Sequence, residues 1–549
     1  MSNEVEASTS MAMANTTVQF AAVGDPEAPG SSTGGSEGAS GAGDGGGSDK
    51  GKGVKFSNED ANPPKRPELM TAKSTRPIVP RGYSVSRRLV EDGTTKMHLK
   101  RLWQKLTVGG STFDGFLLAA SQEVGQSILS LPYVFAQLGF AGGIIFEFFF
   151  ATLALYTCVL LVCMHAQYRH NLKVNEDPKH YDEYYIVSYH EIMEHFVGKW
   201  LKYFSMAVVF FALIGLSTVQ IIATASNMYL VSDHLSKRTW AIVAGCVFTP
   251  IAFVPTFRHY RLLSVLGIGT TTYVAWFMTV TSIISPPQEN VVHNAPQNFE
   301  SFILGAVALL FTYGGHTSNI EVADVMDNPA AYDRSYFWSY VYVFTLTMPN
   351  AVAAYYRFGD LCLYNTNSFA LFPKSVGRDL AMIFMSLHEM VAFGLFAGPL
   401  FHMWEKLIHI HHKPFAFRAA MRIPLCALMV FLAVAFPFFG AINAMLGAFT
   451  TSFGTYIIPA FAFNMAFKSD EGMIKQPYFN FKVMRIINWI TVALVMILGV
   501  GYGGYASIKN FINQFSEYEV FAECYQCNKY GKLQTPDKFD ELSEEGRFL

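Results

Sequence analysis

Eleven stretches of mostly apolar residues constrain this 549-residue chain more than any other feature. A helix needs roughly 20 such residues to cross a hydrocarbon core of about 30 Å. Charged residues make up only 15% of the chain, against about 25% in soluble proteins. So much apolar surface would aggregate in water, so we expect an all-α polytopic membrane protein with eleven spans. The stretches cover about 113–139, 142–166, 201–231, 240–257, 262–285, 301–324, 336–356, 379–404, 421–438, 441–467 and 484–507.

The distribution of Lys and Arg predicts the orientation of these spans. Cytoplasmic loops of membrane proteins keep an excess of both residues. With the N-terminus in the cytoplasm, the inner loops carry sixteen of them. The C-terminal tail is then extracellular. The outer loops carry only Lys237, Arg238, Arg357, Lys374 and Arg378.

The remaining segments indicate no catalytic or metal chemistry. Gly30–Lys52 is polar and rich in Gly and Ser, so we expect residues 1–110 to be a disordered cytoplasmic segment. Tyr184–Trp200 is too polar to span and is interpreted as an interfacial helix. The net charge of −2 gives no attraction to nucleic acid. The sequence has no enzyme motif, no cofactor motif and no convincing metal site. Cys524 and Cys527 form a single CxxC that could pair or link to Cys362.

Two polar clusters interrupt the first and the sixth span. Ser121–Ser127 carries five polar groups and a glycine, and Thr312–Asn319 carries a Gly-Gly pair beside a histidine. Interrupted helices in corresponding positions of two halves indicate an inverted-repeat transporter with a site at the membrane midplane. We therefore expect repeats over 111–285 and 286–467, then a loop and final span over 468–507 and a tail over 508–549. The residues predicted to bind substrate in these clusters are Ser121, Gln122, Glu123, Gln126, Thr312, Gly314, Gly315 and His316.

Further polar groups lie in the third and the eighth span. Ser217, Gln220, Thr224 and Asn227 are spaced to share one helix face, which should look into the bundle; Gln220 is the candidate substrate ligand. His388 in the eighth span is a further candidate ligand. Histidine titrates near physiological pH, and ionisable groups within spans mark functional sites. The candidates for proton coupling are His316, Glu123, Glu321 and Glu389.

Several longer blocks make the chain resemble the auxin influx carriers of plants, within the amino acid/auxin permease family. The resemblance runs from about Ser111 to Cys527 and covers every predicted span. One departure is Ser121-Gln122-Glu123, where the plant carriers tend to have Ser-Asn-Gln. The blocks are Ser130–Gly139, Ala225–Tyr229 with Lys237–Trp240, His259–Arg261, Tyr313–His316, Trp404–Lys406, Phe436–Asn443, Tyr456–Pro459 and Phe521–Cys527.

The resemblance implies a LeuT-type fold of two inverted five-helix repeats plus an eleventh helix. It also implies proton-driven import of indole-3-acetic acid across the plasma membrane, with the proton as coupling ion. We expect the carrier to be a monomer surrounded by membrane lipid. His316, in the Gly-Gly-His motif, becomes the leading proton-linked residue. Two alternatives stay open: a proton-coupled amino-acid permease, in which Glu123 binds the substrate ammonium, and a membrane receptor that transports nothing.

Overall fold

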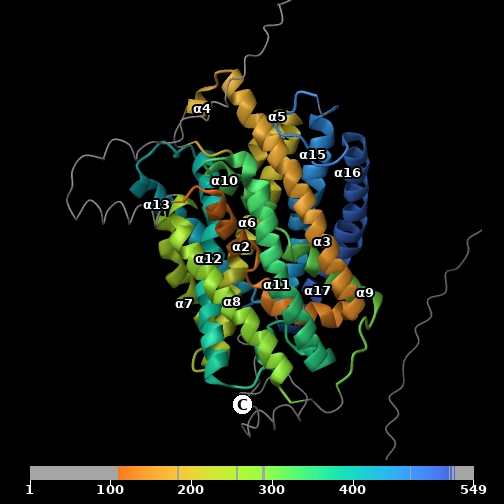
Figure 1. Cartoon of the computed structure of the whole chain (residues 1–549). Helices are drawn as coiled ribbons and strands as arrows, with labels where there is room; N and C mark the ends of the chain where they lie inside the picture. The colour runs from red at the N-terminus through yellow and green to blue at the C-terminus, as the bar shows by residue number, and fades with distance from the viewer. Residues whose placement is uncertain are drawn as a thin grey trace, which may run out of the picture. The chain divides into compact units, whose positions relative to one another are not determined.

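The computed structural model describes residues 109–181, 185–254, 257–286, 291–469, 471–518, 520–521 and 525, and all of their regular structure is helical (Figure 1). Residues 1–108 of the predicted N-terminal segment, Cys524 and Cys527 lie outside this part of the chain, as does most of the tail. The longer helices are α2 (Thr112–Glu123), α3 (Ser127–Val174), α5 (Tyr189–Phe196), α6 (Lys199–Val231), α7 (Lys237–Phe248), α8 (Arg261–Ile284), α9 (Phe299–Thr312), α10 (His316–Asp324), α11 (Tyr332–Phe358), α12 (Val376–Leu407), α13 (Phe415–Ala435), α14 (Phe439–Met445), α15 (Ile458–Ala466), α16 (Phe481–Val495) and α17 (Gly504–Tyr518). Shorter pieces are α4 (Pro178–Tyr181), the π-helices Leu446–Ile457 and Met496–Gly503, and five 3₁₀ turns at Thr249–Phe253, Phe257–Tyr260, Pro329–Ala331, Gly359–Tyr364 and Ser368–Leu371.

Seven helical runs in the described residues are long and apolar enough to cross a membrane by themselves. They are Ser127–Val174, Lys199–Val231, Phe257–Ile284, Val376–Leu407, Phe415–Ala435, Phe439–Ala466 and Phe481–Tyr518. The other predicted spans are also helical but fall short for identifiable reasons. α2, α9 and α10 are halves of interrupted helices, and α7 ends at a 3₁₀ turn that contains Pro250. α11 is rich in tyrosine and carries Asp333 and Arg334 in its first turn. The chain is therefore a polytopic helical bundle, and the count of eleven stays a prediction.

A turn at Gly139 separates the first two predicted spans within α3. Gly139 has φ 77° and ψ 167° inside an otherwise continuous helix. A β-carbon there would lie 2.8 Å from the carbonyl oxygen of Ala295, and positive φ favours glycine. The turn lies at the boundary expected between 139 and 142.

The predicted interfacial helix is the short α5. Its 8 residues cover about 12 Å at 1.5 Å per residue, which is too short to span. Ser188 and Glu191 form a capping box at its start. Tyr189, His190 and Met193 are buried, so the apolar face of α5 packs against protein rather than against the bilayer surface.

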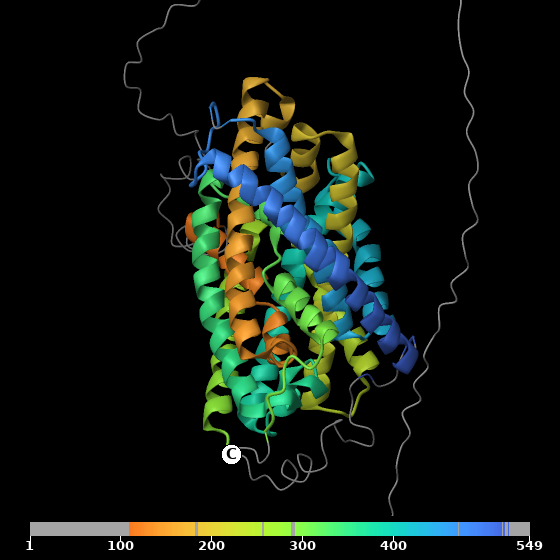
Figure 2. The ribbon, with the colours of Figure 1, turned by 90° about the vertical axis from the view of Figure 1, so that its right-hand side faces the viewer.

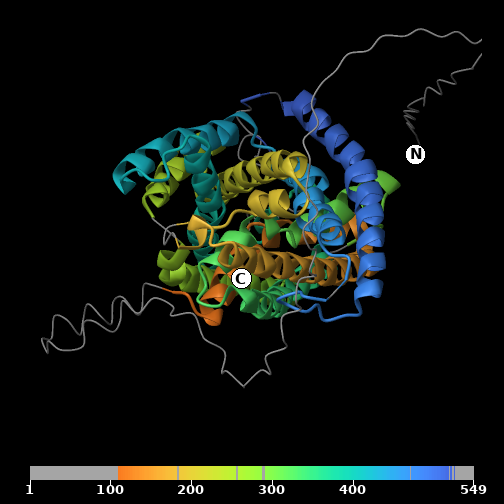
Figure 3. The same ribbon diagram turned by 90° about the horizontal axis from the view of Figure 1, so that it is seen from above.

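The last predicted span extends beyond residue 507, where the sequence places its end. Gly499, Gly501, Gly503 and Gly504 lie in this helix, and glycine weakens an isolated helix, yet the helix continues through the π-helix Met496–Gly503 and α17 to Tyr518. The glycines serve close packing instead: a β-carbon on Gly503 would lie 2.4 Å from Cγ2 of Val307, and small residues let membrane helices approach. The long helix crosses the outside of the bundle diagonally (Figures 2 and 3).

Candidate functional site

The first interruption lies between α2 and α3. α2 ends at Glu123, residues Val124–Gln126 leave the helix, and α3 restarts at Ser127. The break therefore falls inside the predicted Ser121–Ser127 cluster. The break places the N-terminus of α3 inside the protein, with Gln126 as the N-cap residue. A helix N-terminus carries partial positive charge and unpaired N–H groups.

The second interruption lies between α9 and α10, at Tyr313–Gly315, and its glycines are required by close contacts. A β-carbon on Gly314 would lie 2.1 Å from Cγ2 of Thr451, and one on Gly315 would lie 2.1 Å from Oε1 of Glu123. A larger residue at position 315 would therefore displace the Glu123 carboxyl from the start of α10. The Gly-Gly pair is what allows the two breaks to meet.

The two interruptions enclose one small buried cavity of about 20 Å³. Most predicted ligands from the two breaks line it, and Leu216 and Gln220 of α6, Phe311 of α9 and Phe396 of α12 close it. The Nε2 of Gln122 donates to Oγ of Ser318 at 2.8 Å, which ties the end of α2 to α10. A cavity of this size holds about one water molecule. The predicted ligands among its lining are Gln122, Glu123, Gln126, Gln220, Thr312, Gly314 and Gly315.

His316 lies behind the cavity and is linked to Glu123 through Tyr336. The Tyr336 hydroxyl donates to Oε1 of Glu123 at 2.9 Å and lies 3.3 Å from Nδ1 of His316. On its other side, Nε2 of His316 is 3.0 Å from the carbonyl oxygen of Ala154 and 3.1 Å from Oγ1 of Thr157. A carbonyl can only accept, so the contact with Ala154 requires a hydrogen on Nε2.

The side chains of Glu123, Tyr336 and His316 can hold one transferable proton in two arrangements. If Glu123 is protonated, it donates to Tyr336, and Tyr336 donates to Nδ1 of a neutral His316. If His316 is an imidazolium, Nδ1 donates to Tyr336, and Tyr336 donates to the Glu123 carboxylate. All three side chains are buried. The Glu123–Tyr336–His316 chain can therefore carry a proton between two residues without rearranging its heavy atoms.

Sequence reasoning missed Tyr336 and its neighbours on α11. Tyr332, Tyr336 and Tyr340 follow at spacings of four and form a buried stripe, with ring centroids 5.7 Å and 4.6 Å apart. Tyr340 donates to the carbonyl oxygen of Tyr313 at 2.7 Å, which holds the second break in place. The four-residue spacing is the signal that could have revealed the stripe, because residues four apart share a helix face. Glu147 was also missed; it accepts from the Tyr313 hydroxyl at 3.1 Å.

The polar face predicted on α6 is confirmed as an interior face. Ser217, Gln220, Thr224 and Asn227 are all buried. Thr224 donates to Oε2 of Glu389 at 2.5 Å, and Asn227 donates to its Oε1 at 3.2 Å. The eighth-span carboxyl is thus held by α6, away from the cavity.

The structure does not bring Ser121, His388 or Glu321 to the cavity. Ser121 donates to the carbonyl oxygen of Ser264, and Nδ1 of His388 lies 3.1 Å from the carbonyl oxygen of Gly267, so both contact α8. Glu321 is buried on α10, one turn before Asp324. The face of a helix that meets a neighbour depends on the packing angle, which the sequence does not contain.

Buried ion pairs gather at the helix ends that the Lys/Arg distribution assigns to the cytoplasm. Asp324, at the end of α10, accepts from the ring of His165 at 2.8 Å, from the guanidinium of Arg169 and from the N–H of Val187 at 2.8 Å. Glu405 binds Arg422 at 2.7 Å and Arg418 at 2.6 Å. These pairs tie α3 to α10 and α12 to α13 at this end of the bundle.

A second set of contacts in this region belongs to α5. Lys406 binds Glu191 at 3.0 Å. Although burial alone would raise it, the Lys406 ammonium and the N–H of Ser188 hold the pKa of the Glu191 carboxyl below its usual value. Burial lowers the pKa of His190 to about 4. α5 is therefore fixed to α12 by a charged carboxylate beside a neutral histidine.

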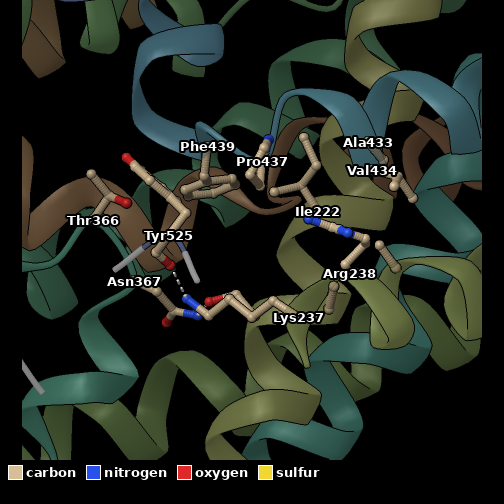
Figure 4. A pocket seen from close by; sticks show the side chains of 13 residues that line it. Ile222, Lys237, Arg238, Thr366, Asn367, Ala433, Val434, Pro437, Phe439 and Tyr525 are labelled. Atoms are coloured by element: carbon tan, nitrogen blue, oxygen red, sulfur yellow. Dashed lines mark hydrogen bonds between the residues drawn. The ribbon is translucent and has the colours of Figure 1, made fainter. Parts of the chain in front are cut away.

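At the opposite end a small pocket of about 20 Å³ lies between α6, α7, α13 and α14 (Figure 4). The Lys237 ammonium donates to the carbonyl oxygen of Tyr525 at 2.8 Å, and the Arg238 guanidinium donates to that of Phe521. The Tyr525 ring packs 5.3 Å from that of Phe438. The described part of the C-terminal segment thus covers this end of the bundle.

Known proteins that resemble the chain are membrane transporters. Residues 108–504 match the family described as transmembrane amino acid transporter protein. Auxin transporter-like protein 1 of Medicago truncatula is 39% identical over 427 residues, covering 76% of this chain and 88% of that protein. Auxin transporter protein 1 of Arabidopsis thaliana is 37% identical over 444 residues, covering 79% of this chain and 90% of that protein. The crystal structure of MhsT in complex with L-phenylalanine has a TM-score of 0.53 at 10% identity, covering 71% of this chain and 99% of that chain.

A helical bundle with two interrupted helices around a buried polar cavity, similar in fold to MhsT, is the architecture of a multi-pass membrane transporter. The relatives are named as transporters, so the chain is not an enzyme. The chain belongs to the amino acid/auxin permease family, which confirms the resemblance seen in its sequence.

Proposed function

We propose that this protein is a proton-driven carrier that imports indole-3-acetic acid across the plasma membrane by alternating access. The fold proposed with it has eleven spans, two inverted five-helix repeats and an eleventh helix, with the N-terminus in the cytoplasm and the C-terminus outside. The observation that carries the proposal is the meeting of both interrupted helices at one cavity that also holds Glu123. The names and the identity of the relatives support auxin as the substrate.

The cavity suits a carboxylate on one condition. α3 and α10 both begin at its wall, where Ser127 and the N-cap residue Gly315 are among the lining residues, and helix N-termini favour anions. Gln122 and Gln220 supply side-chain amides. Glu123 would repel an anionic substrate, because two carboxylates at close range cannot both be ionised without a large cost. Substrate anion and proton therefore bind together, with the proton on Glu123 or passed through Tyr336 to His316.

Proton coupling also answers the electrical problem of import. Moving one negative charge inward against an inside-negative potential costs about 2.3 kcal/mol per 100 mV. A proton carried with the anion removes that cost. Release follows when the proton leaves toward the cytoplasm and Glu123 regains its charge.

An indole ring needs more room than about 20 Å³, since ligand pockets are about 300–1,000 Å³. The helices must therefore part around Phe311 and Phe396, which close the cavity. Ion pairs at Asp324 and Glu405 join α3 to α10 and α12 to α13 at the predicted cytoplasmic end. We expect loading from the other end, past Asn443, whose side-chain amide donates to Oε1 of Gln126 at 3.0 Å.

A second candidate is a proton-coupled carrier of aromatic amino acids. Glu123 favours it, because a carboxylate in the cavity would pair with an α-ammonium group. MhsT, which shares the fold, was crystallised with L-phenylalanine.

One uptake experiment separates the two substrates and tests transport itself. Purified protein in sealed vesicles is given labelled indole-3-acetate under an inward proton gradient, with protein-free vesicles correcting for passive entry of the neutral acid. We expect saturable uptake that collapses with the gradient and that excess tryptophan does not reduce. Saturable tryptophan uptake with no competition by the auxin would show that the substrate is an amino acid and not the auxin. Binding without gradient-dependent uptake would show that the protein is a receptor and not a transporter.

A further inference from the structure

A groove on the lipid-facing side of the bundle, between α3, α11 and the start of α16, lies away from the central cavity. It encloses about 550 Å³. In Figure 2 the orange α3 runs beside the green α11, with the start of the dark-blue α16 nearby. The Tyr156 hydroxyl on α3 donates to Oδ1 of Asn488 on α16 at 2.6 Å, which joins two of the three helices around the groove. We call it the α3–α11–α16 groove.

The length of the groove matches one leaflet of a bilayer. Along α3 its wall runs from Val159 to Phe149, which are ten positions apart, or about 15 Å at 1.5 Å per residue. That is half of a hydrocarbon core of about 30 Å. The walls at this depth are apolar, including Leu153, Phe337 and Met484. An extended acyl chain of one leaflet fits this shape.

The mouth of the groove is built differently from its depth. Tyr478 and Phe479 are 62% and 61% exposed there, and aromatic rings of this kind collect at membrane interfaces. Asp333 is buried, and it binds the Lys475 ammonium at 2.8 Å and accepts from the Tyr478 hydroxyl at 2.5 Å. Its charge is thus compensated inside the protein. Arg334 lines the same mouth and is exposed.

We propose that the α3–α11–α16 groove binds one anionic phospholipid, with its headgroup phosphate on Arg334 and one acyl chain in the groove. Guanidinium binds phosphate oxygens in a bidentate manner. The Asp333–Lys475 pair has no net charge, so Arg334 gives the mouth of the groove a net positive charge. The Lys/Arg distribution predicts that this end is cytoplasmic, where anionic lipids are concentrated. The site is independent of which substrate the carrier moves.

Native mass spectrometry of the full-length protein in detergent tests the site directly. Phosphatidylserine and phosphatidylcholine of equal chain length are added, and bound lipid is counted per protein. Arg334→Gln should lower the preference for phosphatidylserine about fivefold, the effect of one basic residue near an anionic surface. Lys482→Gln removes an exposed cation from the first turn of α16 that does not line the groove, and it should change nothing.

A second pair of variants tests the acyl chain. Leu153→Trp fills the groove and should reduce binding of both phospholipids, whereas Ile283→Trp, on an exposed face of α8, should not. Glycerophosphoserine, which has no acyl chains, should fail to compete. Equal losses in Arg334→Gln and Lys482→Gln would overturn the proposal in favour of diffuse attraction. Full competition by glycerophosphoserine, or displacement by a neutral sterol that Arg334→Gln does not affect, would also overturn it.

Discussion

Replacing Tyr336 by phenylalanine tests the proton connection between Glu123 and His316. The change removes one hydroxyl and adds no atoms. It deletes the contacts to Glu123 at 2.9 Å and to His316 at 3.3 Å, so the two ionisable residues no longer share a hydrogen-bonded neighbour. A hydrogen bond to a charged group contributes about 1.5–3 kcal/mol. At 1.4 kcal/mol per tenfold change, loss of this link should slow proton-driven uptake about ten- to a hundredfold.

The assay compares two modes of transport in the same proteoliposomes. Uptake of labelled indole-3-acetate driven by an inward proton gradient requires the proton to cross, whereas exchange at equal pH requires only that loaded carrier cycles. We expect Tyr336→Phe to lose the first and to keep most of the second. Tyr332→Phe is the matched control, because its hydroxyl, one turn away, donates to Oδ1 of Asn319 and not to the chain.

The double variant Tyr336→Phe with Glu123→Gln makes the result decisive. If the two residues act through one hydrogen-bonded chain, their effects on uptake should fall short of additive by about 0.5–3 kcal/mol. Gradient-driven uptake by Tyr336→Phe with an unchanged rate and pH dependence would refute the reasoning.

Three further variants test the contacts around the site. Gly315→Ala should abolish uptake, because its β-carbon would lie 2.1 Å from Oε1 of Glu123. The control Gly269→Ala should transport normally, because its β-carbon meets nothing within 4 Å. Normal uptake by both variants would show that the helices tolerate the added atom. Because burial lowers the pKa of His190 to about 4, below the unfolded value of about 6.5, its contribution to stability is complete above pH 6.5 and is lost as the pH falls toward 4. Acidification should therefore lower the free energy of unfolding of His190→Gln by up to about 3 kcal/mol less than that of the unchanged protein. This would appear as a flatter profile of Tm against pH, and an unaltered profile would contradict this origin. Asp324→Asn should cost about 3 kcal/mol by leaving Arg169 and His165 without their carboxylate, measured as a lower Tm, whereas Asp327→Asn should cost little because that side chain is 67% exposed.

Much of the fold and part of the site could be predicted because they depend on local sequence. The position of the second break follows from Gly314 and Gly315, and the interior face of α6 follows from the spacing of Gln220, Thr224 and Asn227. The length of α17 could not be predicted in this way. Glycines weaken an isolated helix, and only the close approach of Val307 to Gly503 turns them into packing residues.

The amino-acid sequence by itself determined that this chain is a membrane protein, that two of its helices are interrupted, and to which family it belongs. Hydrophobic length, helix-breaking residues and homologous blocks are all properties of neighbouring residues. Only the tertiary structure decided which polar groups meet. Glu123 and Tyr336 are 213 positions apart, and the packing of α2 against α11 makes them partners, whereas His388 turns to α8. In a bilayer the cost of an unpaired polar group is high, but which partner satisfies it depends on how the helices pack.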